Sequence, residues 1–96
     1  MRLDDRERRL IREAGLRHFG AAPSLFGSRL DDTRRGGDID LLIRTDLPPA
    51  EAARRRLDLL ADLWQLLGEQ KIDIVLDDGQ SPTGIVERAR REAVPV

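Results

Sequence analysis

Apolar residues recur at helical spacing in three parts of this chain, and each part predicts a helix. The first helix is expected over residues 4–18, where a short apolar stripe runs among Arg and Glu residues. The second is expected to begin at Pro48-Pro49 and to end before Gly68, because proline favours a first turn and glycine follows a last one. The third is expected to begin at Ser81-Pro82. The stripe of the second helix that we expect to face the core consists of Ala53, Leu57, Leu60, Trp64 and Leu67.

Three shorter apolar runs, each bounded by turn residues, predict strands. They are SLF at 24–26, DIDLLIR at 38–44 and KIDIVL at 71–76. The first two can pair antiparallel through their loop, whereas the third follows a helical crossover and can pair in parallel. We therefore predict one α/β (α+β) domain over residues 1–96, with a small mixed sheet of three to four strands and helices packed on it.

Composition narrows the classes of protein to consider. The formal net charge is −1, with 17 basic and 18 acidic residues, which argues against a general nucleic-acid binder and predicts no direct contact with nucleic acid. The absence of cysteine excludes disulfides and thiolate metal sites. No apolar run approaches the roughly 18 residues that a membrane helix needs, and the start MRLDDRERR is unlike a signal peptide. These features predict a cytoplasmic protein that does not contact a membrane.

Acidic residues inside two of the predicted strands raise a chemical question. Side chains alternate across a strand, so Asp38 and Asp40 share one face, and Asp73 takes a similar place between two isoleucines of the later strand. If the two strands are neighbours, three carboxylates meet on one face. Carboxylates this close disfavour one another's charge unless they face water or hold a cation. Either they lie on a solvated face, or they bind hard divalent ions such as Mg²⁺, which prefers oxygen ligands.

A glycine and a serine follow the first predicted strand. Glycine allows a ligand to approach the backbone closely, and the amides and hydroxyl of a Gly27-Ser28 turn can bind phosphate oxygens. A nucleoside triphosphate could lie with its terminal phosphates on this turn and its α-phosphate over the aspartates.

The segment FGSRLDDTRRGGDIDLLI, followed by KIDIVL, resembles the minimal nucleotidyltransferase family of the DNA polymerase β-like nucleotidyltransferase superfamily. The resemblance implies a nucleotidyltransferase (polymerase β-like palm) fold. It also implies the roles of individual residues: Gly27, Ser28 and Arg29 would bind the triphosphate, and Asp38, Asp40 and Asp73 would be catalytic and bind metal.

The activity that this resemblance implies is metal-dependent nucleotidyl transfer, with ATP as donor and two Mg²⁺ ions. Stand-alone members resemble the antitoxins of prokaryotic toxin–antitoxin pairs. This implies transfer of AMP to a tyrosine hydroxyl of a HEPN-domain toxin, with which the chain would form a hetero-oligomer. Two alternatives stay open: a small-molecule nucleotidyltransferase completed by homodimerisation, and a non-catalytic antitoxin that masks its partner by binding.

Overall fold

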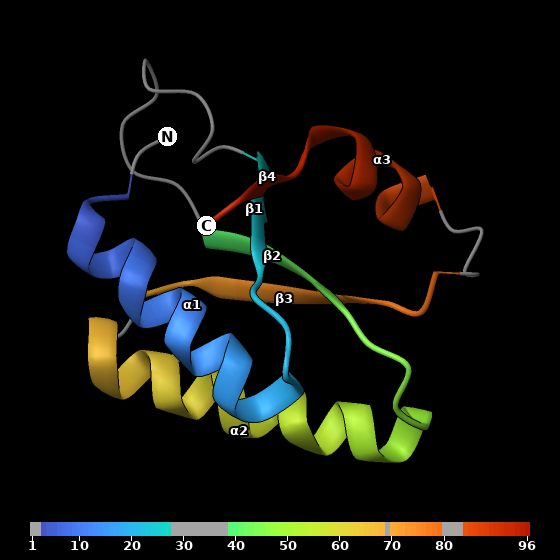
Figure 1. Cartoon of the computed structure of the whole chain (residues 1–96), viewed down its shortest axis with the longest axis horizontal. Coiled ribbons are helices and arrows are strands. Elements are labelled where there is room, and N and C mark those ends of the chain that lie inside the picture. The colour runs from blue at the N-terminus through green and yellow to red at the C-terminus, as the bar shows by residue number, and fades with distance from the viewer. Residues whose placement is uncertain (1–2, 28–38, 69, 80–83) are drawn as a thin grey trace.

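The computed structural model describes residues 3–27, 39–68, 70–79 and 84–96, with Ile85 as backbone alone. Within these residues the chain forms three helices and four strands (Figure 1). In chain order they are α1 (Asp5–Phe19), β1 (Ser24–Phe26), β2 (Ile39–Arg44), α2 (Pro49–Leu67), β3 (Ile72–Asp77), α3 (Gly84–Glu92) and β4 (Val94–Pro95). The helix and strand order predicted from the sequence is confirmed, and β4 is an additional short strand. The predicted start of the last helix, Ser81-Pro82, lies outside the described residues.

The strands form one mixed sheet in the order β3-β2-β1-β4. Strand β1 pairs antiparallel with β2 and with β4, and β2 pairs in parallel with β3. The parallel pair is joined by α2, as a helical crossover requires. Within the described residues β3 is therefore an edge strand. This is the small mixed α+β architecture predicted from the sequence, and it is consistent with a small nucleotidyltransferase-like fold.

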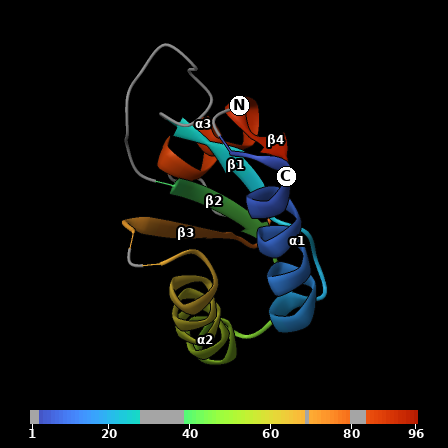
Figure 2. The ribbon, with the colours of Figure 1, turned by 90° about the vertical axis from the view of Figure 1, so that its left-hand side faces the viewer.

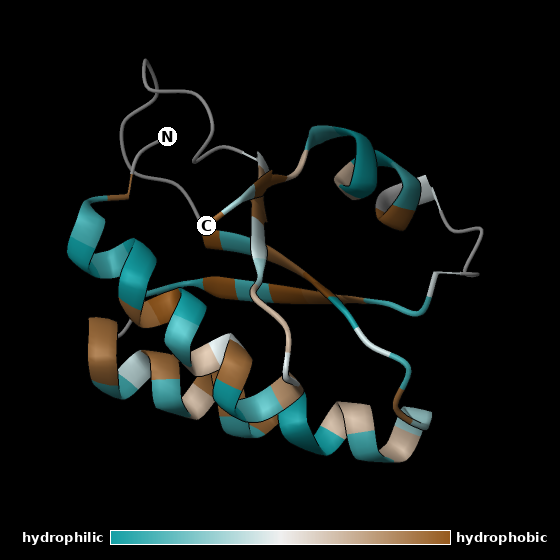
Figure 3. Ribbon diagram, viewed as in Figure 1, coloured by the Kyte–Doolittle hydropathy of each residue, from teal (hydrophilic) through white to brown (hydrophobic). Residues whose placement is uncertain are grey.

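Helices cover both faces of the sheet. Helices α1 and α2 pack side by side on one face, and α3 lies on the other (Figures 1 and 2). Strands β2 and β3 are mostly hydrophobic with hydrophilic interruptions (Figure 3). The apolar side chains of the α1–α2 face form the main core, which includes Ile11, Leu25, Leu41, Leu59 and Ile74. The interruptions therefore fall on the opposite face, the one that α3 covers in part.

Polar contacts fix the helices of the main layer. Asp4 caps α1: its carboxylate accepts a 2.7 Å hydrogen bond from the Glu7 amide, and the Glu7 side chain accepts one from the Asp4 amide. Further along, Arg17 and His18 of α1 both reach Asp62 of α2, at 2.6 and 3.0 Å. The Arg17 guanidinium and, to a smaller extent, His18 lower the pKa of Asp62 against the opposing effect of burial. The contacts of Arg17 and His18 with Asp62 therefore join α2 to α1.

The face of α2 that we predicted to be buried is correct only in part: Leu60 and Leu67 pack against the core, but Ala53, Leu57 and Trp64 are exposed. Leu57 is 60% exposed and Trp64 is 44% exposed, whereas Leu59 and Leu63 are completely buried. Two adjacent stripes of this helix are apolar, so periodicity alone fits either orientation, and packing against α1 and the sheet selects the stripe with Leu59. The Trp64 indole N–H, at the helix surface, donates to the Gln70 carbonyl at 2.9 Å.

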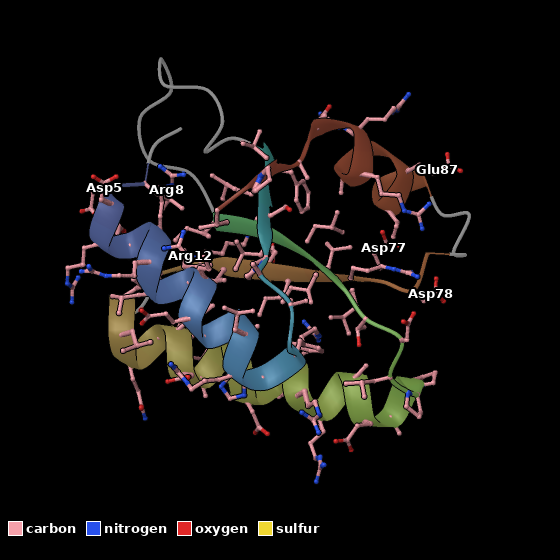
Figure 4. All side chains as sticks on the ribbon, in the orientation of Figure 1. Asp5, Arg8, Arg12, Asp77, Asp78 and Glu87 are labelled. Atoms are coloured by element: carbon pink, nitrogen blue, oxygen red, sulfur yellow. The ribbon has the colours of Figure 1, made fainter. Side chains whose placement is uncertain are left out.

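An ion pair attaches α3 to the sheet. Asp77, at the end of β3, lies between β3 and α3 (Figure 4) and is only 6% exposed. The Arg90 guanidinium donates to both of its carboxylate oxygens, Nε at 2.8 Å, and the Gly79 amide donates at 2.7 Å. The Arg90 contact, helped by the Gly79 amide, lowers the pKa of Asp77 although burial opposes it. Val86 and Ala89 of α3 are buried on the same side. Helix α3 therefore has a fixed place over β3.

None of the helices in the described ranges is both long and apolar enough to cross a membrane.

Candidate functional site

Two of the predicted acids lie next to each other on neighbouring strands. In the parallel register of β2 and β3, Asp40 is paired directly with Asp73. The residues on either side of each acid belong to the buried α1–α2 face, so both carboxylates project from the other face of the sheet. Asp40 is half-buried and Asp73 is exposed. Like charges directly opposite each other in a sheet are destabilising, and a bound cation would offset this repulsion.

Gly27, a third predicted site residue, lies beside this pair. Phe26 is paired with Asp40 across β1 and β2, and Gly27 follows Phe26. Gly27 has a φ of +82°, in the region that favours glycine, and a Cβ placed on it would lie 2.3 Å from Asp40 Oδ2. The backbone thus passes close against the carboxylate, where a side chain would displace it. Gly27 just after β1, Asp40 on β2 and Asp73 on β3 therefore form one row.

The remaining predicted site residues are Ser28, Arg29 and Asp38, and all three lie outside the described residues. Within the described ranges no group of three or more His, Cys, Asp or Glu side chains is placed to hold a metal ion. The structure thus describes two of the three predicted carboxylates, Asp40 and Asp73, and the role of Asp38 stays a prediction.

A cavity of about 410 Å³ lies over the row of strand residues. Phe26, Gly27, Asp40 and Asp73 contribute to its wall, together with Ile74 and Val75 of β3. Its strand side combines apolar surface with two carboxylates. A cavity of this size and mixed lining is typical of small-ligand sites.

The first cavity is also lined by helix residues that were not selected from the sequence. Arg56 of α2, and Arg88 and Glu92 of α3, all border the cavity. Charged residues on an amphipathic helix are usually solvated, so the sequence offers no signal that separates these two arginines from the others. Only the tertiary arrangement, in which α2 and α3 approach β3 from opposite sides, brings them to the carboxylates.

A second cavity, of about 570 Å³, lies at the opposite ends of β2 and β3. Its wall includes Thr45, Pro48 and Leu76, and none of the predicted site residues that the structure describes borders it. Among the residues described around it, no two carboxylates are in register on adjacent strands. Although this second cavity is larger, its described wall offers no paired ligands for a metal ion like those of the cavity over Asp40 and Asp73.

No protein-family model matches this sequence, and no curated protein is significantly similar to it. Any functional assignment therefore rests on the residues and on their arrangement.

The arrangement suits an anionic, metal-dependent ligand. Two carboxylates supply the oxygen ligands that Mg²⁺ prefers, and Mg²⁺ is commonly held by one or two carboxylates together with substrate phosphates. The donor set at Asp40 and Asp73 thus fits the ion that the family resemblance implies. Gly27, whose backbone lies close against the Asp40 carboxylate, stands at one end of the row, and Arg56 and Arg88 border the same cavity.

Proposed function

We propose that this protein is a metal-dependent nucleotidyltransferase that transfers AMP from ATP to a hydroxyl group. The observation that supports this most is the register of β2 and β3, which pairs Asp40 with Asp73 beside the glycine that follows β1. The sequence motif alone left open whether the two acid-bearing strands were neighbours. Their adjacency is what this chemistry requires.

In this reaction the acceptor hydroxyl oxygen forms a bond to the α-phosphorus, and the bond from that phosphorus to the bridging oxygen breaks to release pyrophosphate. Asp73, exposed at the edge of the cavity, would accept the hydroxyl proton. Asp40 and Asp73, with Asp38 as predicted, would hold Mg²⁺. When bound, the ion would neutralise phosphate charge and polarise the phosphoryl group. Gly27 and Ser28 would bind the terminal phosphates, as the family resemblance implies.

The acceptor that we propose is a tyrosine of a partner HEPN-domain toxin, so that the chain would act as the antitoxin of a cytoplasmic toxin–antitoxin pair. This part of the proposal is supported by the resemblance of the FGS…DID…KID pattern to minimal nucleotidyltransferases. The cavity lies at the β3 edge, where Asp73 is exposed, and a macromolecular acceptor could approach there.

The test is intact-mass spectrometry of the purified protein incubated with ATP, Mg²⁺ and a helical protein encoded by the neighbouring reading frame. We expect AMP units on that protein with wild type and with Asp58→Asn, an exposed acid of α2, and none with Asp73→Asn. Modification of an added aminoglycoside or nucleoside instead would contradict the protein acceptor and keep the enzyme. A stable complex without any modification would contradict catalysis and favour masking by binding.

A further inference from the structure

Two arginines border the cavity that contains the carboxylates. Arg88 and Glu92 come from α3, which packs on β3 and leads into β4 beside β1. Arg56 reaches the same cavity from α2. A polyphosphate lying across Asp40 and Asp73 would therefore share the cavity with two arginine side chains.

The environments of these arginines leave them available to a ligand. Arg54 and Arg55, the neighbours of Arg56 on α2, both donate hydrogen bonds to Glu51, at 2.7 and 2.8 Å. In the described part of the chain, by contrast, no carboxylate forms an ion pair with Arg56, which is half-buried and lines the cavity.

Arg88 has one carboxylate partner in the described ranges. Its Nε donates to Glu92 at 3.1 Å, and both side chains are substantially exposed, at 71% and 42%. Exposed ion pairs of this kind contribute little, whereas a guanidinium binds phosphate through short, charge-assisted hydrogen bonds. A phosphate group can therefore displace Glu92. The Asp77–Arg90 pair meanwhile keeps α3, and with it Arg88, in place over β3.

Charged side chains of both signs line the described part of the cavity wall. Asp40, Asp73 and Glu92 contribute three carboxylates there, and Arg56 and Arg88 contribute two guanidinium groups. The carboxylates repel a free polyphosphate, and divalent cations bound to them would remove that repulsion. The arginines then add to the attraction for the phosphates.

From these observations we propose that Arg56 and Arg88 bind phosphate oxygens of the nucleotide in the cavity that they share with the carboxylates. The inference rests on the proposed function for the identity of the ligand, a nucleoside triphosphate. The contact itself requires only an anion, and this allows the two proposals to be tested separately.

The probe for the arginines is inorganic tripolyphosphate without metal, titrated by calorimetry at low salt. We expect weak binding by wild type and tighter binding by Asp73→Asn, because one repelling charge is removed. In the Asp73→Asn background, Arg56→Gln or Arg88→Gln should each weaken binding about tenfold, the equivalent of about 1.4 kcal/mol.

The controls remove equal charge from the same helices away from the cavity. Arg54→Gln on α2 and Arg91→Gln on α3 should change the affinity for tripolyphosphate less than twofold. Arg56→Lys keeps the charge and most of the side chain, and it should restore most of the binding if Arg56→Gln also loosens the fold. Equal affinities for all four glutamine variants, or no tripolyphosphate binding in either background, would overturn the inference.

A parallel titration with ATP and Mg²⁺ separates this failure from failure of the proposed function. If wild type binds Mg²⁺-ATP and the arginine variants bind it equally, the arginine inference fails and nucleotide binding stands. If wild type binds tripolyphosphate through the arginines but never Mg²⁺-ATP, the anion site stands and the nucleotidyltransferase proposal fails.

Discussion

Replacing Gly27 by alanine should damage the site without unfolding the protein. The new Cβ would lie 2.3 Å from Asp40 Oδ2, whereas non-bonded atoms prefer separations near 3.5 Å, so the carboxylate must move by about 1 Å. Mg²⁺ demands near-ideal geometry with bonds of about 2.0–2.1 Å, and it tolerates errors of only a few tenths of an ångström. We therefore expect the affinity for Mg²⁺-ATP to fall at least about tenfold.

The same substitution also strains the backbone, and Gly68 supplies the matched control. Gly27 and Gly68 have nearly equal φ angles of +82° and +85°, but nothing lies within 4 Å of a Cβ on Gly68. Each alanine should cost roughly 1–3 kcal/mol of unfolding free energy, because a positive φ is unfavourable for a residue with a side chain, and Gly68, with a ψ of 172°, lies in a region essentially confined to glycine. Thermal melts should therefore show clear losses for both variants, with midpoints lowered by roughly 4–24 °C.

Calorimetric titration of Mg²⁺-ATP into folded samples of both variants distinguishes the two effects. Gly68→Ala should bind like wild type, and Gly27→Ala should bind weakly. Equal affinities for all three proteins would refute the reasoning, because the displaced Asp40 carboxylate would then have no part in binding.

Two further predictions concern stability. Leu59→Ala should reduce the unfolding free energy, measured in urea, by roughly 3–5 kcal/mol because Leu59 is completely buried. Leu57→Ala, at a position that is 60% exposed, should cost less than about 1 kcal/mol. Similar losses for the two variants would show that the buried face of α2 is assigned wrongly. Arg90 and the Gly79 amide lower the pKa of Asp77, so its stabilising effect should be complete above pH 4 and disappear as the pH falls through the lowered value. Asp77→Asn should therefore lower the unfolding free energy by about 1.5–3 kcal/mol at pH 7. In urea titrations, the difference in unfolding free energy between this variant and wild type should shrink below pH 4. A difference that is independent of pH would contradict the assigned ion pair.

The sequence predicted the helix and strand order because each element has a hydrophobic period of its own, bounded by proline or glycine. The strand bounds at 24–26 are the same in the structure, and those predicted at 71–76 differ by one residue at each end. Strand β4 was missed because two residues, one of them proline, give no period to detect. The buried face of α2 was predicted only in part because its two apolar stripes have similar spacing, and only contacts with α1 and the sheet decide between them.

The candidate site was predictable in part for a similar reason. Alternation along a strand placed Asp40 and Asp73 on the polar faces of their strands, but the pairing of the two strands, and their exact register, is a tertiary property. Arg56 and Arg88 could not be selected, because their positions at the cavity depend on how two helices pack around β3.

The central claim is that Asp40 and Asp73 act together on one metal–nucleotide complex, and a double-mutant cycle tests it most directly. The affinity for Mg²⁺-ATP should be measured by calorimetry for wild type, Asp40→Asn, Asp73→Asn and the double variant. If both carboxylates hold the same ligand, each single substitution should remove most of the binding and the double variant should lose little more than either one. Losses that simply add, or variants that bind as well as wild type, would contradict the shared site.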